Sequence, residues 1–348
     1  MIDVNNTTIK QVSVHYVGNK TNGENIILSK TPIDVEDEKL KEILSSFFLG
    51  SFKTEEFYSF TFSNGDFTLN PVYTFASAIF DHPDSFHINS IHLAKHLYEN
   101  SLHPQIKAGD LFICYFPTLR YGEEQAEALG IFKSENRQDF LKLNPDQNGF
   151  SLQYDDGIDI NKLDKGCLIL NLQRDEGYRL SIIDKANKTS EAQFWKDTFL
   201  QIKPYKDEYH YTKEFLNIAK DYVATKMTEE YHVSKADQID LLNRSVNFFK
   251  ENESFDKELF ENEIFKEESL IQSFRSFDES YRQDNDLELL DSFDISKEAV
   301  KKQARNFKGV LKLDKNFHVY IHGDRELIEQ GTDADGRKFY KIYYEKEL

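Results

Sequence analysis

The chain has 348 residues, with 61 acidic and 43 basic side chains and a formal net charge of −18. This length favours two or three folded units, because single domains usually span about 100–200 residues. The overall charge excludes a histone-like coat on nucleic acid, since duplex DNA would repel so acidic a protein.

No stretch approaches the roughly 20 consecutive apolar residues that a membrane-spanning helix needs. Residues 1–9 also lack the charged and then apolar pattern of a secretory signal. Cys114 and Cys167 lie in apolar, strand-like segments, so we expect both to be small buried side chains in a reducing compartment. The sequence therefore predicts a soluble, cytosolic protein.

The first 205 residues mix strands with helices. Alternating apolar residues predict a hairpin from strands at 8–17 and 25–28, followed by a helix with Asp34 as its candidate cap and Gly50 as its end. Further helices are expected at 73–80, 89–99 and 194–202, and further strands at 111–117, 126–133, 150–154, 167–172 and 178–183. Strands so closely spaced favour an antiparallel sheet.

From about residue 207 the pattern becomes helical, with helices expected at 211–227, 235–250, 255–265 and 270–281. Ser234 is the candidate cap of the second of these helices. The segment 251–294 carries 15 acids and only 4 bases. This run is either a solvated helical surface or a face that mimics DNA and docks on a partner.

At the end of the chain, the sequence predicts a basic helix at 296–307 that begins at Ser296. Strands are expected after it at 310–313, 317–321, 327–330 and 338–344, and these would form a small β-meander. The predicted class is α+β. It comprises a mixed sheet-and-helix N-terminal domain (1–205), an acidic helical segment (206–295), and a basic helix with an antiparallel β-meander (296–348).

A basic run follows the most acidic segment directly, with no acid between residues 301 and 312. On a helix that continued far enough, four of its bases would lie three or four residues apart, as a stripe able to follow phosphates. The alternatives are an ordinary solvated face and a surface that docks on the chain's own acidic segment. The candidate DNA-contact residues are Lys301, Lys302, Arg305, Lys308, Lys312 and Lys315. No zinc finger, RNA-recognition motif or clear helix-turn-helix accompanies them, so we expect electrostatic binding with little sequence specificity.

Five of the ten histidines fall within 22 residues, at His82, His87, His92, His96 and His103. His92 and His96 stand four apart on a predicted helix and would suit a zinc or iron ion, with Asp81, Asp84 or His103 as a third ligand. However, no glutamate lies between them as a general base, and the intervening Lys95 would repel a dication.

Signatures of other catalytic chemistry are also missing from the sequence, which has neither a Gly-x-Ser-x-Gly elbow nor a phosphate-binding loop. We therefore predict no catalytic residue, no metal and no cofactor. The chain is expected not to be an enzyme, and a metal-dependent enzyme that uses His92 and His96 is the less favoured alternative.

Four stretches together resemble the bacterial nucleoid-associated protein family of the NdpA type. They are SIHLAKHLY at 90–98, HPQIKAGDL at 103–111, GIDINKL at 157–163 and FKGVLKLD at 307–314. Their order and the length of the chain fit such proteins from end to end. The resemblance implies a cytosolic protein of the nucleoid, with an α/β N-terminal half and a DNA-associated role. It brings no established set of contact residues.

The leading hypothesis is a non-enzymatic, nucleoid-associated protein that binds double-stranded DNA weakly and without sequence specificity, or associates with DNA-handling proteins. A homodimer could bridge two duplexes and so organise the chromosome. The alternative is an interaction protein whose acidic helices mimic DNA and dock on a DNA-handling enzyme. No contact with a membrane is expected.

Overall fold

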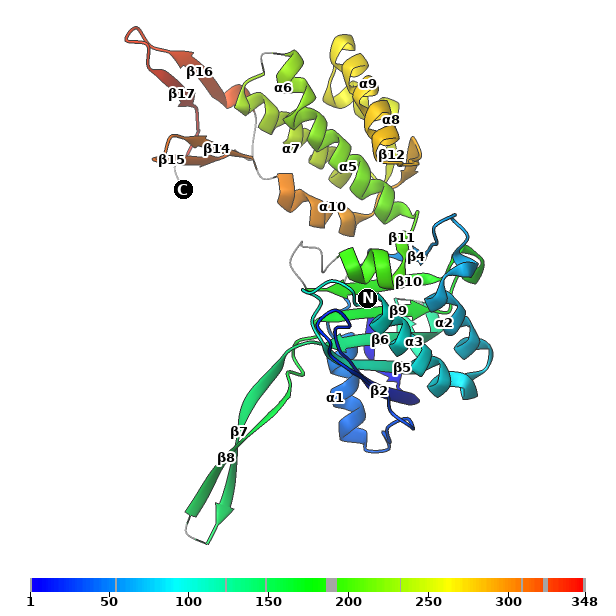
Figure 1. Ribbon diagram of the computed structural model, residues 1–348. Helices are drawn as coiled ribbons and strands as arrows, with labels where there is room; N and C mark the ends of the chain where they lie inside the picture. Colours follow the sequence, from blue (N-terminus) through cyan, green and yellow to red (C-terminus); the bar gives the residue numbers. More distant parts are fainter. Residues whose placement is uncertain are drawn as a thin grey trace. The chain divides into compact units, whose positions relative to one another are not determined.

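The computed structural model describes residues 2–53, 55–122, 124–147, 149–185, 193–231, 233–307, 309–321 and 325–346. The chain divides into two compact units, Met1–Tyr205 and Lys206–Leu348, which are considered separately below (Figure 1). Every strand pair formed by the described residues is antiparallel. The predicted α+β class is confirmed.

The N-terminal unit is built on one nine-stranded sheet. Eight strands follow the order β11-β4-β10-β9-β6-β5-β2-β3, and the ninth, β1, pairs with the C-terminal part of β5 at Thr118–Tyr121. Its central strands are buried on both faces, because residues of the run Leu111–Phe116 alternate between two separate apolar clusters. The predicted hairpin near the N-terminus is confirmed as β2 with β3. The strands are β1 (Ile2–Thr8), β2 (Gln11–Val17), β3 (Ile26–Ile27), β4 (Tyr58–Phe60), β5 (Gly109–Tyr121), β6 (Glu124–Ser134), β9 (Lys165–Leu170), β10 (Arg179–Asp184) and β11 (Ile202–Pro204).

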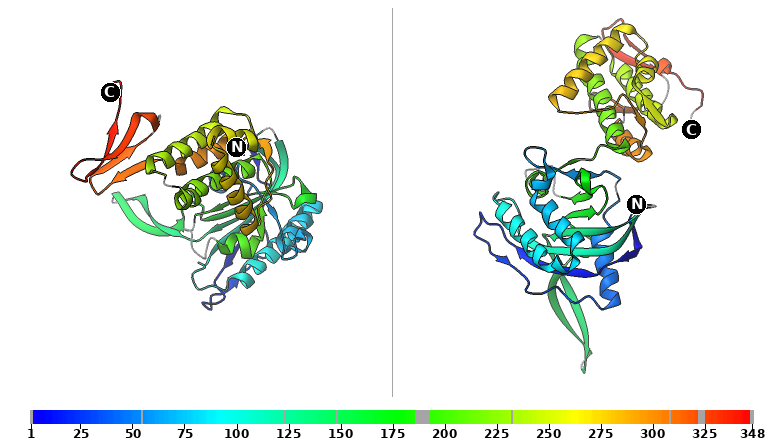
Figure 2. Two further views of the ribbon diagram at one scale, coloured as in Figure 1. Left: turned by 90° about the horizontal axis from the view of Figure 1, so that it is seen from above. Right: turned by 90° about the vertical axis from the view of Figure 1, so that its right-hand side faces the viewer.

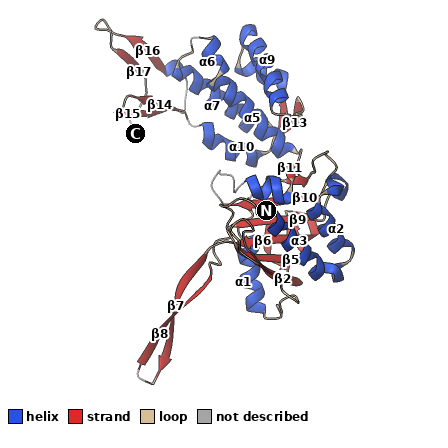
Figure 3. Ribbon diagram, in the orientation of Figure 1, coloured by secondary structure: helices blue, strands red, loops and turns tan. Residues whose placement is uncertain are grey.

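Helices cover both faces of this sheet (Figure 3). One face carries α2 (Pro71–Asp81), α3 (Phe86–Asn100) and the π-helical segment η4 (Phe194–Leu200), and the other carries α1 (Glu38–Leu49). Short 3-10 turns are η1 (Phe67–Leu69), η2 (Pro83–Ser85) and η3 (Arg174–Glu176). Cys114 and Cys167 are both free and fully buried, as predicted.

The cap predicted for α1 is wrong. Asp37, rather than Asp34, begins the helix, because its Oδ1 accepts a hydrogen bond from the Leu40 amide at 2.8 Å. Asp34 instead accepts from the Glu36 amide in the preceding loop at 2.9 Å. Gly50 ends the helix as expected.

Strands β7 (Arg137–Asp146) and β8 (Gly149–Ile158) form a separate two-stranded ribbon. The ribbon extends away from the sheet and the helices of the N-terminal unit (Figures 1 and 2). The sequence pattern predicted only a short strand at 150–154, because the polar residues and Pro145 of β7 conceal its alternation.

The C-terminal unit is a helical bundle around a core rich in phenylalanine. Its helices are α5 (Glu208–Ala224), α6 (Lys226–Glu230), α7 (Lys235–Glu251), α8 (Lys257–Ile264), α9 (Glu268–Asp284), α10 (Lys297–Gln303) and the 3-10 turn η5 (Ala304–Phe307), with a small ladder of β12 (Ser254–Asp256) and β13 (Ser292–Asp294). Ser234 begins α7 through a reciprocal capping box with Asp237, which confirms the predicted cap. None of the described helices is long and apolar enough to cross a membrane.

The last strands pair as two separate hairpins and not as one continuous meander. They are β14 (Val310–Leu313) with β15 (Phe317–Tyr320), and, after the turn η6 (Arg325–Leu327), β16 (Ile328–Thr332) with β17 (Lys338–Ile342). Leu311, Ile321 and Ile328 pack on Ala236 and Ile239 at the start of α7. Helix α7 therefore holds this region in place.

Candidate nucleic-acid interface

The basic helix α10 is held to the bundle by one buried face. Ser296 begins it, with its Oγ accepting from the Ala299 amide at 3.2 Å. Val300 is buried in the phenylalanine core together with Phe307 from η5. Since this face is fixed against α5 and α7, the bases Lys301, Lys302 and Arg305 point to the exposed side.

These three bases are exposed on α10 and η5. The Lys301 side chain is 72% exposed, and its Nζ lies 4.0 Å from a Glu298 carboxylate oxygen. Such an exposed, distant pair is weak, because water screens it. The Lys302 Nζ lies 5.6 Å from the centre of the Tyr209 ring. The positive charges therefore remain on the surface, where a phosphate can reach them.

The hairpin β14–β15 adds Lys312 and Lys315. Lys312 lies opposite His318 in the ladder, and the alternation of side chains puts Tyr320 on the same outer face, while Leu311 faces α7. Lys315 is exposed in the connecting turn. Sequence reasoning missed His318 and Tyr320, although the strand register across the turn at 314–316 would have placed them. Lys308, the remaining predicted contact, lies outside the described residues.

A pocket of 250 Å³ lies where α7 meets η5 and Gly309. It is lined by Asn243, Val246, Asn247, Lys250, Ala304, Phe307 and Gly309. Lys250 and Asn247 are exposed, so α7 brings an ammonium group and an amide donor to the edge of the basic region. Sequence reasoning missed Lys250, because it lies some 50 residues before the basic run and only the packing of α7 brings it there.

Lys297 is used differently from its neighbours on α10. Its Nζ donates to the carbonyl oxygens of Lys250 and Asn252, at the C-terminal end of α7. A cation at this end of a helix complements the helix dipole and satisfies carbonyls that the helix leaves open. Lys297 therefore ties α10 to α7, which orients the exposed bases.

The acidic segment is more acidic on its surface than its composition indicates. Glu261 and Asp278 are buried, whereas the other 13 of its 15 acids are exposed. Arg275 donates to Glu261 at 2.6 and 2.8 Å, and Lys257 and Arg282 bind Asp278 at 2.5 and 2.7 Å. Three of the four bases of the segment thus neutralise two internal carboxylates, which leaves an outer surface with a large excess of negative charge.

The clustered histidines have separate local roles. The His92 ring stacks on Phe75 with centres 5.4 Å apart, while His96 Nε2 lies 3.2 Å from the Phe199 carbonyl oxygen. Burial lowers the pKa of His96. Asp81 forms a two-pronged ion pair with Arg174. Within the described parts of the chain, no three His, Cys, Asp or Glu side chains are grouped so as to hold a metal ion, so nothing there supports the less favoured alternative of a metal site at His92 and His96.

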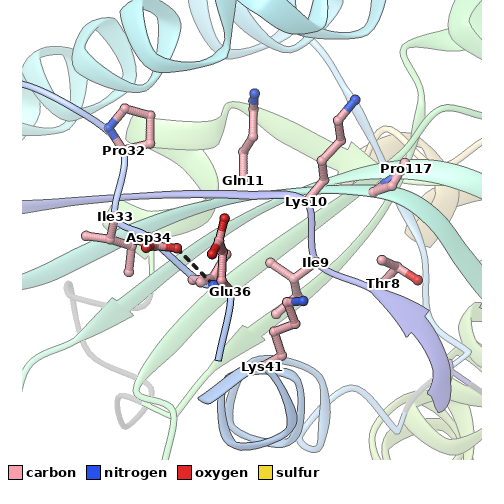
Figure 4. Close-up of a pocket in the computed structure, with 11 residues that line it drawn as sticks. Thr8, Ile9, Lys10, Gln11, Pro32, Ile33, Asp34, Glu36, Lys41 and Pro117 are labelled. Carbon is pink, nitrogen blue, oxygen red and sulfur yellow. Dashed lines mark hydrogen bonds between the residues drawn. The ribbon is translucent and has the colours of Figure 1, made fainter. Parts of the chain in front are cut away.

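The N-terminal unit has a pocket of 560 Å³ beside the start of β2 (Figure 4). Lys10 and Lys41 line it together with Asp34 and Glu36, and the remaining lining residues are Thr8, Ile9, Gln11, Pro32, Ile33, Val35 and Pro117. Lys41 is already paired with Glu38 at 2.7 Å. Charges of both signs surround the pocket without converging on one point, and we assign no chemistry to it.

A family model described as nucleoid-associated protein YejK matches residues 13–346, which is nearly the whole chain. A search of curated protein sequences finds none that matches.

Proposed function

The chain belongs to the nucleoid-associated protein family whose model it matches, and from this premise we propose that it binds duplex DNA through a basic surface on its C-terminal unit. The basic surface consists of Lys301, Lys302 and Arg305 on α10 and η5, Lys312 and Lys315 on the β14–β15 hairpin, and Lys250 on α7. Lys308, which lies outside the described residues, stays a candidate from the sequence alone. The observation that carries the proposal is the exposure of Lys301, Lys302, Arg305 and Lys312, on elements anchored to α7 and with no acid between residues 301 and 312 in the sequence.

The mode of binding in this proposal is electrostatic. Each lysine or arginine contacts a phosphate and releases the counterion bound there, and such contacts carry no information about base sequence. The protein acts without catalysis and associates with DNA as part of the bacterial nucleoid. Its net charge of −18 keeps the affinity low and confines contact to this one surface.

Electrophoretic mobility of duplex DNA at low and moderate salt tests the proposal. We expect the triple variant Lys301→Glu, Lys302→Glu, Arg305→Glu to lose at least about tenfold in affinity, because three phosphate contacts become repulsive. A matched control reverses Lys53, Lys95 and Lys107, three exposed lysines of the N-terminal unit, and so changes the net charge equally. The control variant should bind DNA nearly as the wild type does.

Two results would contradict the proposal. One is wild-type affinity in the triple variant, and the other is no DNA binding by the wild type even at low salt. Equal losses in the triple variant and its control would mean that only the net charge matters and that the basic surface is not the contact.

The acidic surface supports a second function, docking on the basic groove of a DNA-handling enzyme. The supporting observation is the set of 13 exposed acids whose neighbouring bases are used internally. Pull-down from a bacterial lysate treated with nuclease separates the two functions. Partners that stay bound after nuclease treatment indicate protein–protein contact, whereas partners that are lost were bridged by DNA.

A further inference from the structure

The β7–β8 ribbon has one apolar and one polar face. Residues that lie opposite each other in an antiparallel ladder share a face, and successive pairs alternate between the two faces. Three pairs in succession on one face are apolar: Leu141 with Tyr154, Leu143 with Leu152, and Pro145 with Phe150. The other face carries the pairs Lys142 with Gln153 and Asn144 with Ser151, which are polar, and Phe140, which lies opposite Asp155 and whose ring lies beside the Lys142 ammonium group.

The apolar face is uncovered. The exposed fractions are 71% for Leu141, 62% for Leu143, 71% for Phe150, 64% for Leu152 and 80% for Tyr154. Side chains of this size are normally buried in a soluble protein, and a contiguous apolar patch usually marks an interaction site. An isolated two-stranded ribbon is also only marginally stable in water, so this ribbon requires a covering surface to hold its form.

The charge of the ribbon argues against nucleic acid as that covering. Its two strands carry two bases, Arg137 and Lys142, and four acids, Asp139, Asp146, Asp155 and Asp156. Arg137 is bound by Asp110 and Asp156, and Lys142 by Asp155. No net positive charge remains to attract phosphate, so the occupant is an uncharged apolar protein surface.

We propose that this occupant is the apolar face of the same ribbon in a second copy of the chain. About a two-fold axis, the Leu143–Leu152 pair of one copy meets its counterpart, and the Pro145–Phe150 pair meets the Leu141–Tyr154 pair of the partner. No charged side chain lies among these three pairs. The next pair on the same face is Asp139 with Asp156, and Arg137 binds Asp156 at 2.9 Å, which offsets part of its charge. Isologous contacts of this kind close on themselves and give a dimer.

The area agrees with a stable dimer. Large apolar side chains expose roughly 150–250 Å² each when fully accessible, so the face offers about 600 Å² per copy at the observed exposures. Two such faces bury about 1,200 Å², which reaches the lower end of specific interfaces. A closed dimer would also hold two basic surfaces in one particle, although the ribbon contact itself does not depend on DNA binding.

Sedimentation equilibrium of the full chain over a range of protein concentrations tests the dimer. The wild type should approach twice its chain mass of 40.8 kDa, and the variant Leu143→Asp, Leu152→Asp should stay at that mass at every concentration. The matched control Gln153→Asp changes a residue on the polar face and should dimerise like the wild type. Fluorescence of Trp195, the single tryptophan, confirms that the N-terminal unit of each variant is folded.

A cysteine placed at the proposed two-fold axis tests the dimer contact independently. Under mild oxidation, Leu143→Cys should form a disulfide-linked dimer, whereas Gln153→Cys on the opposite face should not, and the native Cys114 and Cys167 are buried and do not interfere. A wild type that stays monomeric at all concentrations would overturn the proposal, as would a dimer that survives the double aspartate substitution. Capture of a different protein by a monomeric wild type would assign the ribbon to another partner and would likewise overturn it.

Discussion

His15 shows how one buried titratable residue links the N-terminal unit to pH. Its Nδ1 accepts from the Ser29 amide at 3.2 Å, and its Nε2 lies 3.0 Å from the Ser90 hydroxyl. Burial, and secondly the nearby His87, lower the pKa of His15 from 6.5 to about 4. The folded unit therefore holds this ring neutral at a pH where the unfolded chain would protonate it.

The first prediction concerns the stability of this unit in acid. Because the pKa of His15 is lower in the folded than in the unfolded state, unfolding takes up a proton between about pH 6.5 and 4, and stability falls as pH falls through that window. The full effect is on the order of 3 kcal/mol. Urea unfolding followed by Trp195 fluorescence at several pH values should show this fall in the wild type and a smaller one in His15→Gln.

The control for this prediction is His82→Gln, which changes an exposed histidine and should keep the wild-type pH dependence. Identical pH profiles for the wild type and His15→Gln would show that His15 does not supply the effect. An equal loss of pH dependence in both variants would also contradict the assignment.

At the scale of elements, the sequence predicts what depends on neighbouring residues. Ser234 and Asp237 lie three apart and form the capping box of α7, so the start of this helix is readable from the chain alone. The apolar run around Cys114 likewise predicts a strand, and the structure shows that both faces of this strand are buried. In contrast, the cap of α1 depends on which of two nearby aspartates meets a free amide, and the pattern does not distinguish Asp34 from Asp37.

The residues of the candidate interface also fall into two groups, those that local spacing predicts and those that only the tertiary packing places. The exposure of Lys301 and Arg305 follows from helical spacing around Val300, and this spacing is visible in the sequence. The roles of Lys250 and Lys297 do not follow from spacing, because they depend on the packing of α10 and η5 against the end of α7. Contacts between residues distant in sequence are set by the core, which a local pattern does not specify.

A second prediction concerns the contact between α7 and the β14–β15 hairpin. Gly309 lies so close to Ile239 that a Cβ there would come within 2.2 Å of the Ile239 Cγ2 atom. We expect Gly309→Ala to lower the free energy of unfolding of the C-terminal unit by about 1–3 kcal/mol, because the hairpin must move away. It should also weaken DNA binding without changing any charge, since Lys312 and Lys315 move with the hairpin.

Denaturant unfolding followed by far-ultraviolet circular dichroism measures the first effect. The double variant Gly309→Ala, Ile239→Ala provides the control, because the smaller side chain makes room for the new methyl group. Its loss of stability should be less than the sum of the two single losses. Strict additivity would show that the two residues do not compete for space.

At the scale of the whole molecule, charge is separated within one unit. The segment 251–294 exposes most of its acids, whereas residues 297–315 carry seven bases and two acids. The net charge of −18 is thus an average over surfaces of opposite sign. Family membership together with this separation makes a local DNA contact compatible with an acidic protein.

The dependence of duplex DNA affinity on salt concentration tests the central claim most directly. Fluorescence anisotropy of a labelled duplex should give a linear fall of log K with log salt, with a slope of about −0.9 for each phosphate contacted. Neutralising Lys301, Lys302 and Arg305 to glutamine should make the slope less negative by about 2–3, while neutralising Lys53, Lys95 and Lys107 should leave it unchanged. A slope that is the same in both variants and the wild type would contradict the account.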